Sequence, residues 1–512
     1  MGDVVLGRVV GETSHTGVIF TAVRPPRVGE YVLVDYGGRY VLGIVEYSKI
    51  GNPLLLQESL RPEVVDRAEV FNAERHQYMI GYARLLSWVD TLVKKGEVEI
   101  PRYPPRPMAR VLEASDEVLR EVFTRDGRDG WVRLGVLANH TNVPFYVNVQ
   151  SLVSRHLAIL AVTGAGKSNA VAVLVKGIVE ELGGTVLIID MHSEYGEVCS
   201  RVNRVRPAVN PAQLTLWEYY RLLRLDPSAT KQRLYLRKAY AYVKGLALRE
   251  ADRFLDLLIG EVEHYLEKME YRVKDGVRSI DRRDRSSIAD LLLKLYDLRD
   301  RYGGRVLTPT APVDLESAVR PSHANVIQLG EVDEEVADVI TSHYVRRLLD
   351  ERKAWRASGR GYPVPVLVVI EEAHILVPKG RHTLTKDVVA RVAREGRKFG
   401  VGLCLVSQRP KNVDEDALSQ TNNKVILKLV EPSDKRYVQA SSETLSDELL
   451  ELLPSLNVGE AVVLGMMTPI PALVKVDLAA RKGGGSDVRV YEEWAKYGRG
   501  GGGKGFYSDL GI

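Results

Sequence analysis

The chain has 512 residues, of which 71 are Lys or Arg and 67 are Asp or Glu, so its formal net charge is +4. A hydrophobic fraction of 45% and a charged fraction of 27% are typical of folded globular proteins and exclude a largely disordered chain. This length predicts about three domains. A surplus of four charges is too small to indicate nucleic-acid binding by itself, so any basic surface must be local.

Cysteine content and hydropathy indicate the compartment. The two cysteines, Cys199 and Cys404, cannot build a disulfide framework, which favours a reducing environment. The N-terminus lacks a basic segment followed by an apolar one, and no apolar run approaches the roughly 18 residues of a membrane span. The sequence therefore predicts a soluble cytoplasmic protein without a membrane partner.

The first hundred residues contain short β-rich runs separated by turn residues. Residues 35–40 carry a pair of glycines between two such runs, a pattern typical of a hairpin. These features predict a small β-barrel over residues 1–100, although a module that merely stabilises the chain fits them as well. A proline-rich stretch then predicts a linker over residues 101–142. The expected strands lie at 9–10, 18–21, 31–35 and 40–45.

From residue 143 the pattern changes to buried-type strands that alternate with helical segments. Continuous apolar strands separated by helices predict an α/β fold with a mostly parallel sheet covered on both faces. We expect this core over residues 143–200 and 321–480. Its strands are expected at 157–161, 186–190, 366–370, 402–406, 425–427 and 461–464.

Two regions do not belong to this alternation. Residues 201–320 are charged and helical, and apolar residues recur there at helical spacing, first from Phe254 to Met269 and then from Ile288 to Leu298. These stripes predict the core of a helical insertion. Residues 481–512 are rich in glycine and predict a flexible C-terminal arm.

A phosphate-binding loop is predicted at residues 161–168. The segment follows an apolar strand, ends in Gly-Lys-Ser and opens a helix, which is the context of a P-loop. Lys167 would contact the β- and γ-phosphates of ATP, and the Ser168 hydroxyl would be a ligand of Mg²⁺. Ala161 occupies the place of the first glycine of the usual pattern, which removes no phosphate contact. The other residues expected at the nucleotide are Thr163, Gly164, Ala165, Gly166 and Asn169.

Two carboxylates follow the strand at 366–370. Glu371 and Glu372 stand at its carboxyl end, where α/β sheets bind ligands. The first could hold Mg²⁺, directly or through water, and the second could polarise the water that attacks the γ-phosphate. Together with the P-loop they predict ATP hydrolysis.

Other polar residues end neighbouring strands. Asp190 ends the strand at 186–190, and a polar role beside the nucleotide is favoured over strand capping. Asp190, His192 and Ser193 are too close along the chain to form a hydrolase triad. Gln408 follows the strand at 402–406, where it could orient the attacking water, although an ordinary polar strand end fits too.

Basic residues gather beyond the two carboxylates. Arg391, Arg394 and Arg397 lie in a predicted helix over 390–399, and either an arginine finger or a solvated basic face fits them. Lys379 and Arg381 lie in a basic loop that suits a phosphate backbone but is also typical of a solvated loop.

In combination these motifs resemble the HerA family, within the HerA–FtsK class of hexameric DNA translocases. The resemblance rests on the strand-rich N-terminal module and on five motifs that occur in order along nearly the whole chain. These motifs lie at residues 154–168, 190–195, 371–374, 396–400 and 407–410. The fold that the resemblance implies is a RecA-like P-loop NTPase core with an N-terminal barrel of the HAS type.

The family implies more than the residues do. It forms ring hexamers with ATP sites between subunits, threads double-stranded DNA through the ring, and works with the nuclease NurA in resecting DNA ends. The same resemblance leaves room for another break-processing nuclease complex. By motif match, Arg397 becomes the preferred arginine finger, and Arg155 could reach a phosphate at the subunit boundary. The glycine-rich tail resembles the arm with which the family covers a nucleotide site.

Three functions of different classes fit the sequence. The first is an ATP-driven DNA translocase or helicase. The second is a non-motor switch, in which ATP stabilises a scaffold for a DNA-repair partner. The third is a P-loop enzyme that phosphorylates a small molecule, which is disfavoured because adjacent carboxylates suit water better than an alcohol acceptor.

Overall fold

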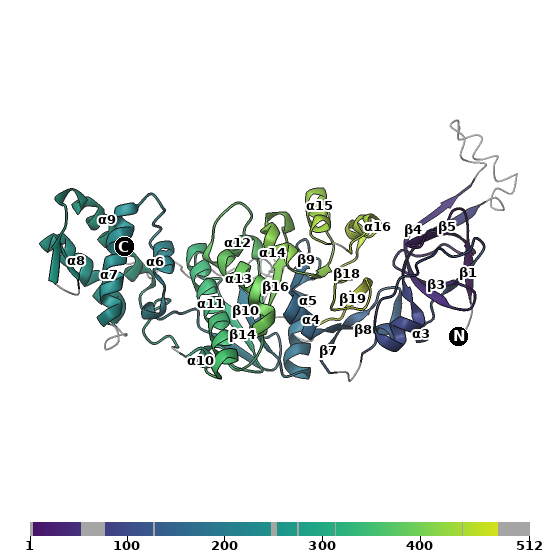
Figure 1. Cartoon of the computed structure of the whole chain (residues 1–512), viewed down its shortest axis with the longest axis horizontal. Coiled ribbons are helices and arrows are strands. Elements are labelled where there is room, and N and C mark those ends of the chain that lie inside the picture. Colours follow the sequence, from purple (N-terminus) through teal and green to yellow (C-terminus); the bar gives the residue numbers. More distant parts are fainter. Residues whose placement is uncertain are drawn as a thin grey trace, which may run out of the picture.

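The computed structural model describes residues 4–52, 77–125, 129–246, 253–273, 276–312, 314–442 and 444–479. The molecule is elongated, with a β-barrel at one end, a large sheet in the middle and a group of helices at the other end (Figure 1). The predicted C-terminal arm at 481–512 lies outside the described residues.

The N-terminal part is a closed antiparallel barrel, as predicted. Alternate side chains such as Leu6, Phe20, Val32 and Val45 fill its interior, because successive residues of a strand point to opposite faces. Closing a sheet on itself leaves no unpaired strand edge. Around the barrel the order is β1 (Val5–Val9), β2 (Gly17–Ala22), β5 (Tyr78–Trp88), β4 (Tyr40–Gly51), β3 (Tyr31–Asp35) and β6 (Arg110–Glu113).

The predicted hairpin at residues 35–40 joins β3 to β4. Gly37 and Gly38 have φ angles of 86° and 100°, a conformation that favours glycine. The Asp35 carboxylate accepts hydrogen bonds of 2.9 Å from the backbone N–H groups of both glycines. The glycine pair and the Asp35 side chain therefore form the turn that the sequence predicts.

The barrel extends beyond the boundary that the sequence indicated. Strand β6 pairs with β1 and β3, so the barrel continues to Glu113. Residues 101–142, predicted to be a linker, also contain α3 (Asp116–Phe123), β7 (Trp131–Leu137) and the start of β8 (His140–Asn148). Strands β7 and β8 belong to the central sheet. The structure gives the bounds of these strands, but the division of the chain into domains remains a prediction.

The central sheet has 11 strands and is mixed. Its strands are parallel from β11 to β17 and antiparallel from β17 to β8. The order is β11 (Val202–Val205), β14 (Ala324–Gln328), β10 (Thr185–Asp190), β15 (Val366–Ile370), β16 (Val401–Ser407), β9 (Leu157–Leu160), β17 (Asn423–Ile426), β18 (Glu460–Leu464), β19 (Ala472–Val476), β7 and β8. The predicted α/β core is confirmed, with β18 running antiparallel to its neighbours.

Both faces of the parallel strands are buried, which explains their continuous apolar sequences. In β10, Leu187 and Ile189 contribute to one hydrophobic core, whereas Val186 and Ile188 contribute to the other. The first core includes residues of α11 (Glu334–Ser358) and α13 (Leu384–Phe399), and the second includes residues of α5 (Lys167–Lys176). Helices on both faces therefore fix the strand ends at which polar residues gather.

The helical insertion lies at the end of the molecule opposite the barrel (Figure 1). Both predicted apolar stripes are buried there except for Met269, which is partly buried. Among the described residues, no helix is both long and apolar enough to cross a membrane. The helices of this part are α6 (Leu216–Leu222), α7 (Thr230–Leu246), α8 (Phe254–Lys268) and α9 (Arg285–Tyr302), with a hairpin of β12 (Glu270–Val273) and β13 (Gly276–Ser279). The short helix α10 (Leu315–Ala318) lies beside α11 at the central sheet (Figure 1).

Candidate active site

The predicted phosphate-binding loop connects β9 to α5. Gly164 and Gly166 have φ angles of 80° and 106°, so both need the conformational freedom of glycine. Helix α5 begins at Lys167, and the unpaired N–H groups of its first turn can bind an anion. Ala161 is fully buried and does not need a positive φ, which explains why alanine is tolerated there.

The order of strands brings the predicted motifs together. Strand β16 lies between β9, which leads into the P-loop, and β15, which leads into Glu371 and Glu372. Because the three strands are parallel, their carboxyl ends meet at one edge of the sheet. Gln408 follows β16 and therefore lies between the loop and the carboxylates. Its Oε1 atom accepts a hydrogen bond from the Thr163 hydroxyl of the P-loop.

Lys167 and Glu372 form an ion pair at the centre of this site. Their Nζ and Oε1 atoms are 2.7 Å apart, and the Glu372 side chain is only 3% exposed. Glu372 has a left-handed backbone with φ of 47°, which costs about 1–3 kcal/mol in a residue other than glycine. The sharp turn aims this carboxylate from the end of β15 back toward the loop.

Two histidines also approach Glu372. The Nδ1 atom of His374 lies 3.1 Å from Glu372 Oε2, and the Nε2 atom of His192 lies 3.6 Å from Oε1. Burial alone would raise the pKa of Glu372, but the neighbouring His374 and the charge of Lys167 lower it to about 2. Glu372 is therefore held as an ionised carboxylate.

Glu371 has the opposite environment. Burial is the main cause that raises the pKa of its carboxyl to about 8, and Asp190, Glu194 and Glu372 add to it against the effect of Lys167. The side chain is 1% exposed and its Oε2 atom has no hydrogen-bond partner. The pKa values of these two adjacent glutamates are thus shifted from the ordinary value in opposite directions, an arrangement typical of catalytic sites.

A buried tyrosine completes the surroundings of Glu371. The Tyr195 hydroxyl donates a hydrogen bond of 3.2 Å to Glu371 Oε1. Burial, followed by the charge of Glu371, raises the pKa of Tyr195 well above its ordinary value, so the phenol remains a proton donor. Asp190 is fully buried, and its carboxylate accepts hydrogen bonds of 3.0 Å from the backbone N–H groups of Glu194 and Tyr195.

Two other predicted nucleotide residues lie at the edges of the site. The Asn169 side chain donates to the Asp477 carbonyl and accepts from the Ala479 N–H group, so it anchors the strand end after β19. Arg155 ends α4 (Val149–Arg155) directly before β9, and no ion pair joins it to another described residue. The structure therefore leaves the Arg155 guanidinium available, whereas both groups of the Asn169 amide are occupied.

The arginines of α13 differ in their contacts. Arg391 is paired with Asp350 at 2.7 Å. Arg394 and Arg397 are exposed, and within the described part of the chain they have no hydrogen bond or ion pair from their side chains. Helix α13 ends at Gly400, whose φ of 71° provides the left-handed cap that follows Arg397.

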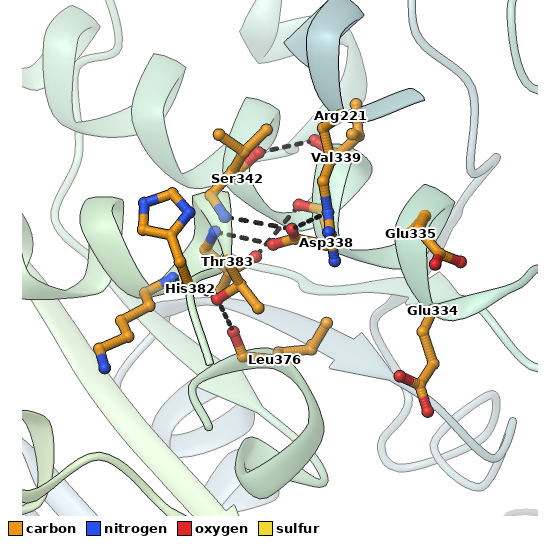
Figure 2. A network of polar contacts seen from close by, with 12 residues as sticks. Arg221, Glu334, Glu335, Asp338, Val339, Ser342, Leu376, His382 and Thr383 are labelled. Atoms are coloured by element: carbon orange, nitrogen blue, oxygen red, sulfur yellow. Dashed lines mark hydrogen bonds and ion pairs between the residues drawn. The ribbon is translucent and has the colours of Figure 1, made fainter. Parts of the chain in front are cut away.

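The start of α13 is attached to α11 by the Asp338 carboxylate. Asp338 is 1% exposed and accepts hydrogen bonds from the backbone N–H groups of Leu384 and Thr385, and from Arg221 of the helical insertion. Figure 2 shows this carboxylate between Arg221 and the segment with Thr383, which caps α13. The helix that carries Arg394 and Arg397 is thereby fixed to α11 and to the insertion.

The predicted basic loop precedes this helix and is already paired. Lys379 Nζ lies 2.6 Å from Glu415, and Arg381 lies 3.2 Å from Glu334. Both basic side chains are about half exposed, at 51%. A phosphate could reach them, but it would compete with carboxylates of the same chain.

No functional role for Tyr195, His374 or His192 was predicted from the sequence. Tyr195 and His192 lie in the motif at residues 190–195, and His374 lies in the motif at residues 371–374. Membership in these motifs could have signalled contact with the carboxylates. The directions of the side chains, however, depend on the left-handed turns at Ser193 and Glu372, which the sequence did not indicate.

The donor set suits a magnesium ion that arrives with a nucleotide. Among the described residues, no three His, Cys, Asp or Glu side chains gather where they could hold a metal ion by themselves. Mg²⁺ in nucleotide sites usually takes one or two protein oxygens and otherwise water and phosphate. The buried, unpartnered Oε2 atom of Glu371 lacks a positive partner, which such an ion would supply.

Together, the P-loop, the adjacent carboxylates and the strand order define a P-loop ATPase. Three regions of the chain match known domain families: the HAS barrel domain at residues 6–72, the central domain of helicase HerA at 132–348 and the HerA-like C-terminal domain at 361–479. The chain belongs to the HerA helicase family, which confirms the resemblance drawn from its motifs.

Individual relatives match over nearly their whole length. The DNA double-strand break repair helicase HerA of Saccharolobus solfataricus is 38% identical over 496 residues, which cover 96% of each chain. A probable helicase of Methanocaldococcus jannaschii, MJ1565, is 36% identical over 502 residues, with 96% of this chain and 94% of the relative covered. The solved structure of VirB4 of Thermoanaerobacter pseudethanolicus has a TM-score of 0.52 and 17% identity over 70% of this chain and 99% of that one. That structure supports the fold of the core.

The raised pKa of Glu371 predicts a pH-dependent gain from Glu371→Gln in the nucleotide-free protein. The folded chain binds the Glu371 proton more tightly than the unfolded chain, so the carboxyl destabilises the fold increasingly as pH rises from about 4.5 to about 8. Gln removes this charge. With EDTA present, the melting temperature of the variant should exceed that of wild type by a margin that grows from pH 5 to pH 9, by about 1 °C per kcal/mol relieved in a chain of 512 residues. A margin independent of pH would contradict the assigned environment.

Proposed function

We propose that this chain is an ATP-driven DNA translocase or helicase that works as a ring hexamer, with a NurA-type nuclease, in resecting double-strand DNA breaks. The observation that carries the proposal is the 2.7 Å contact between Lys167 of the P-loop and Glu372. It joins the part of the site that would hold a triphosphate to the part that would activate water. Family membership and relatives named as double-strand break repair helicases support the choice of DNA as the substrate.

ATP binding would begin at the P-loop. The backbone N–H groups around Gly164 and Gly166 and the start of α5 would surround the phosphates, with Thr163 and Ala165 in the same loop. The Lys167 ammonium would leave Glu372 and bind the β- and γ-phosphates, because a triphosphate offers more negative charge than one carboxylate. Ser168 and Glu371 would hold Mg²⁺, which neutralises charge on the phosphates when bound.

Water activation is assigned to Glu372. Once Lys167 contacts phosphate, Glu372 loses the main charge that stabilises its ionised form and becomes a better proton acceptor. The His374 ring would stay 3.1 Å from its second oxygen. Gln408, bonded to Thr163, would sense the γ-phosphate from the end of β16. Asp190 would act one step away, through the turn that holds Tyr195.

The proposal of a ring is supported by arginines that form no ion pair within the described part of one chain. Arg397 and Arg394 are exposed on α13 and, among the described residues, have no acidic partner. A guanidinium presented to the γ-phosphate of a neighbouring subunit would stabilise the transition-state charge. Arg155 stands close to the P-loop strand and could contact the same nucleotide. These residues favour a site completed by a second copy.

The basic loop and the barrel are the proposed contact surfaces for DNA and for the nuclease. Lys379 and Arg381 would bind DNA phosphates by exchanging Glu415 and Glu334 for them, which favours contact at low salt. The barrel would provide the surface for the nuclease or for another break-processing complex. The proposed site of action is the cytoplasm, where the DNA of an archaeal cell lies.

A non-motor switch is the second candidate. The lowered pKa of Glu372, about 2 in the nucleotide-free site, makes it a weak base until Lys167 moves. A chain in which Lys167 never fully leaves would bind ATP, hydrolyse it slowly and act as a scaffold. The rate of turnover and its response to DNA separate this candidate from the motor.

The first test changes the carboxylate to which water activation is assigned. Glu372→Gln should keep ATP binding and lower the rate of ATP hydrolysis by about 10²–10⁴-fold, because the amide accepts no proton. Steady-state ATPase assays and binding of a fluorescent ATP analogue measure the two effects. Glu415→Gln, whose glutamate pairs with Lys379 of the basic loop, is the matched control and should retain the wild-type rate. Wild-type turnover by Glu372→Gln would remove this residue from the mechanism.

The second test addresses the arginine finger. Arg397→Ala subunits mixed with wild type should reduce ATPase activity more steeply than their fraction, because each variant disables the site of its neighbour. Arg391→Ala is the matched control, since Arg391 lies on the same helix but is paired with Asp350. Activity that falls only in proportion to the wild-type fraction would argue against a contribution in trans.

The third test separates the motor from the switch. Duplex DNA should stimulate ATP hydrolysis several-fold, and a NurA-type nuclease should change the rate further. Raising the salt concentration should reduce the DNA effect, because phosphate contacts release counterions. A slow rate that responds to neither DNA nor nuclease would support the switch instead.

A further inference from the structure

Tyr195 stands out among the buried polar groups near the site because the proposed mechanism does not use it. Its side chain is 2% exposed, and its hydroxyl donates to Glu371 Oε1 at 3.2 Å. This hydroxyl therefore contacts a side chain that is expected at the magnesium ion.

The local backbone is built to place this phenol. Asp190 is fully buried, and its two carboxylate oxygens accept hydrogen bonds from the backbone N–H groups of Glu194 and Tyr195. Ser193 has a left-handed backbone with φ of 60° between them. The turn thus folds back from the end of β10 toward β15, and the buried Asp190 carboxylate stabilises it.

The hydrogen bond leaves the two oxygens of Glu371 unequal. Oε1 is bound by Tyr195, whereas Oε2 is buried and without a partner. A carboxylate fixed through one oxygen cannot rotate freely, so the other oxygen keeps one direction. Groups in the second coordination layer of metal sites orient the ligands in this way.

We propose that Tyr195 is a positioning residue for the metal–nucleotide complex, which fixes Glu371 so that its free oxygen faces the ion. The inference rests on the proposed function, since it assumes that the P-loop binds ATP with Mg²⁺. It adds a specific task for the hydroxyl, because a phenylalanine would fill the same volume but would leave Glu371 unrestrained.

The experiment compares Tyr195→Phe with Tyr344→Phe in the full-length chain. Tyr344 is a matched control, since it is 3% exposed and its hydroxyl also donates one buried hydrogen bond, to the Ala208 carbonyl at 3.0 Å. Binding of a fluorescent, slowly hydrolysed ATP analogue is titrated with Mg²⁺ and repeated in EDTA. Mn²⁺ binding in the presence of the analogue is followed by electron paramagnetic resonance, which needs no turnover.

Tyr195→Phe should raise the Mg²⁺ concentration for half-maximal binding by about 10- to 100-fold and leave the affinity in EDTA within about twofold of wild type. Tyr344→Phe should change neither. In the Glu371→Gln background, Tyr195→Phe should add little, because the ligand on which it acts is already altered.

Other outcomes would overturn the inference. An unchanged Mg²⁺ dependence, or an equal loss of affinity with and without the ion, would make Tyr195 a packing residue. The same conclusion follows if the variant unfolds in EDTA while Tyr344→Phe does not. Failure of wild type to bind the analogue at all would contradict the proposed function itself, which distinguishes the two failures.

Discussion

The ion pair between Lys167 and Glu372 is the interaction on which the rest of the site depends. Two opposite charges that are 12% and 3% exposed must stabilise each other, because a lone buried charge is strongly unfavourable. The pair holds the P-loop against the carboxylate edge of the sheet before any nucleotide binds. A triphosphate must therefore replace one partner of an existing pair, which links nucleotide binding to a change at the residue expected to activate water.

The sheet makes this pair possible by setting the order of its strands. Lys167, Glu372 and Gln408 are separated by up to 241 positions in the sequence, yet they follow β9, β15 and β16, which are direct neighbours. Both faces of these strands are buried, so their positions are fixed by packing rather than by the polar residues at their ends. Helix α13 is held by hydrogen bonds, because the Asp338 carboxylate of α11 accepts from the backbone of its first residues (Figure 2).

Local signals predicted much of this arrangement. Short-range sequence patterns determine the P-loop, the glycine turn at residues 35–40 and the polar residues at strand ends. The structure also has the predicted barrel and α/β core. What the sequence missed depends on distant partners or on rare backbone angles. The barrel extends to Glu113 because β6 pairs with β1 and β3, and the Asn169 amide meets residues about 308 positions away. Tyr195 reaches Glu371 only through the turn at Ser193.

The two glutamates lie at one edge of the sheet, and their different surroundings support the different tasks that we propose for them. Glu372 faces Lys167 and His374, so its charge is satisfied without a ligand. Glu371 faces Tyr195, Asp190 and the other carboxylates, so its charge is disfavoured until a cation arrives. A nucleotide that brings Mg²⁺ would reverse both conditions at once: it draws Lys167 away from Glu372 and supplies the missing charge beside Glu371. Adjacent positions in the sequence can thus become a metal ligand and a base because the turn at Glu372 sends them in different directions.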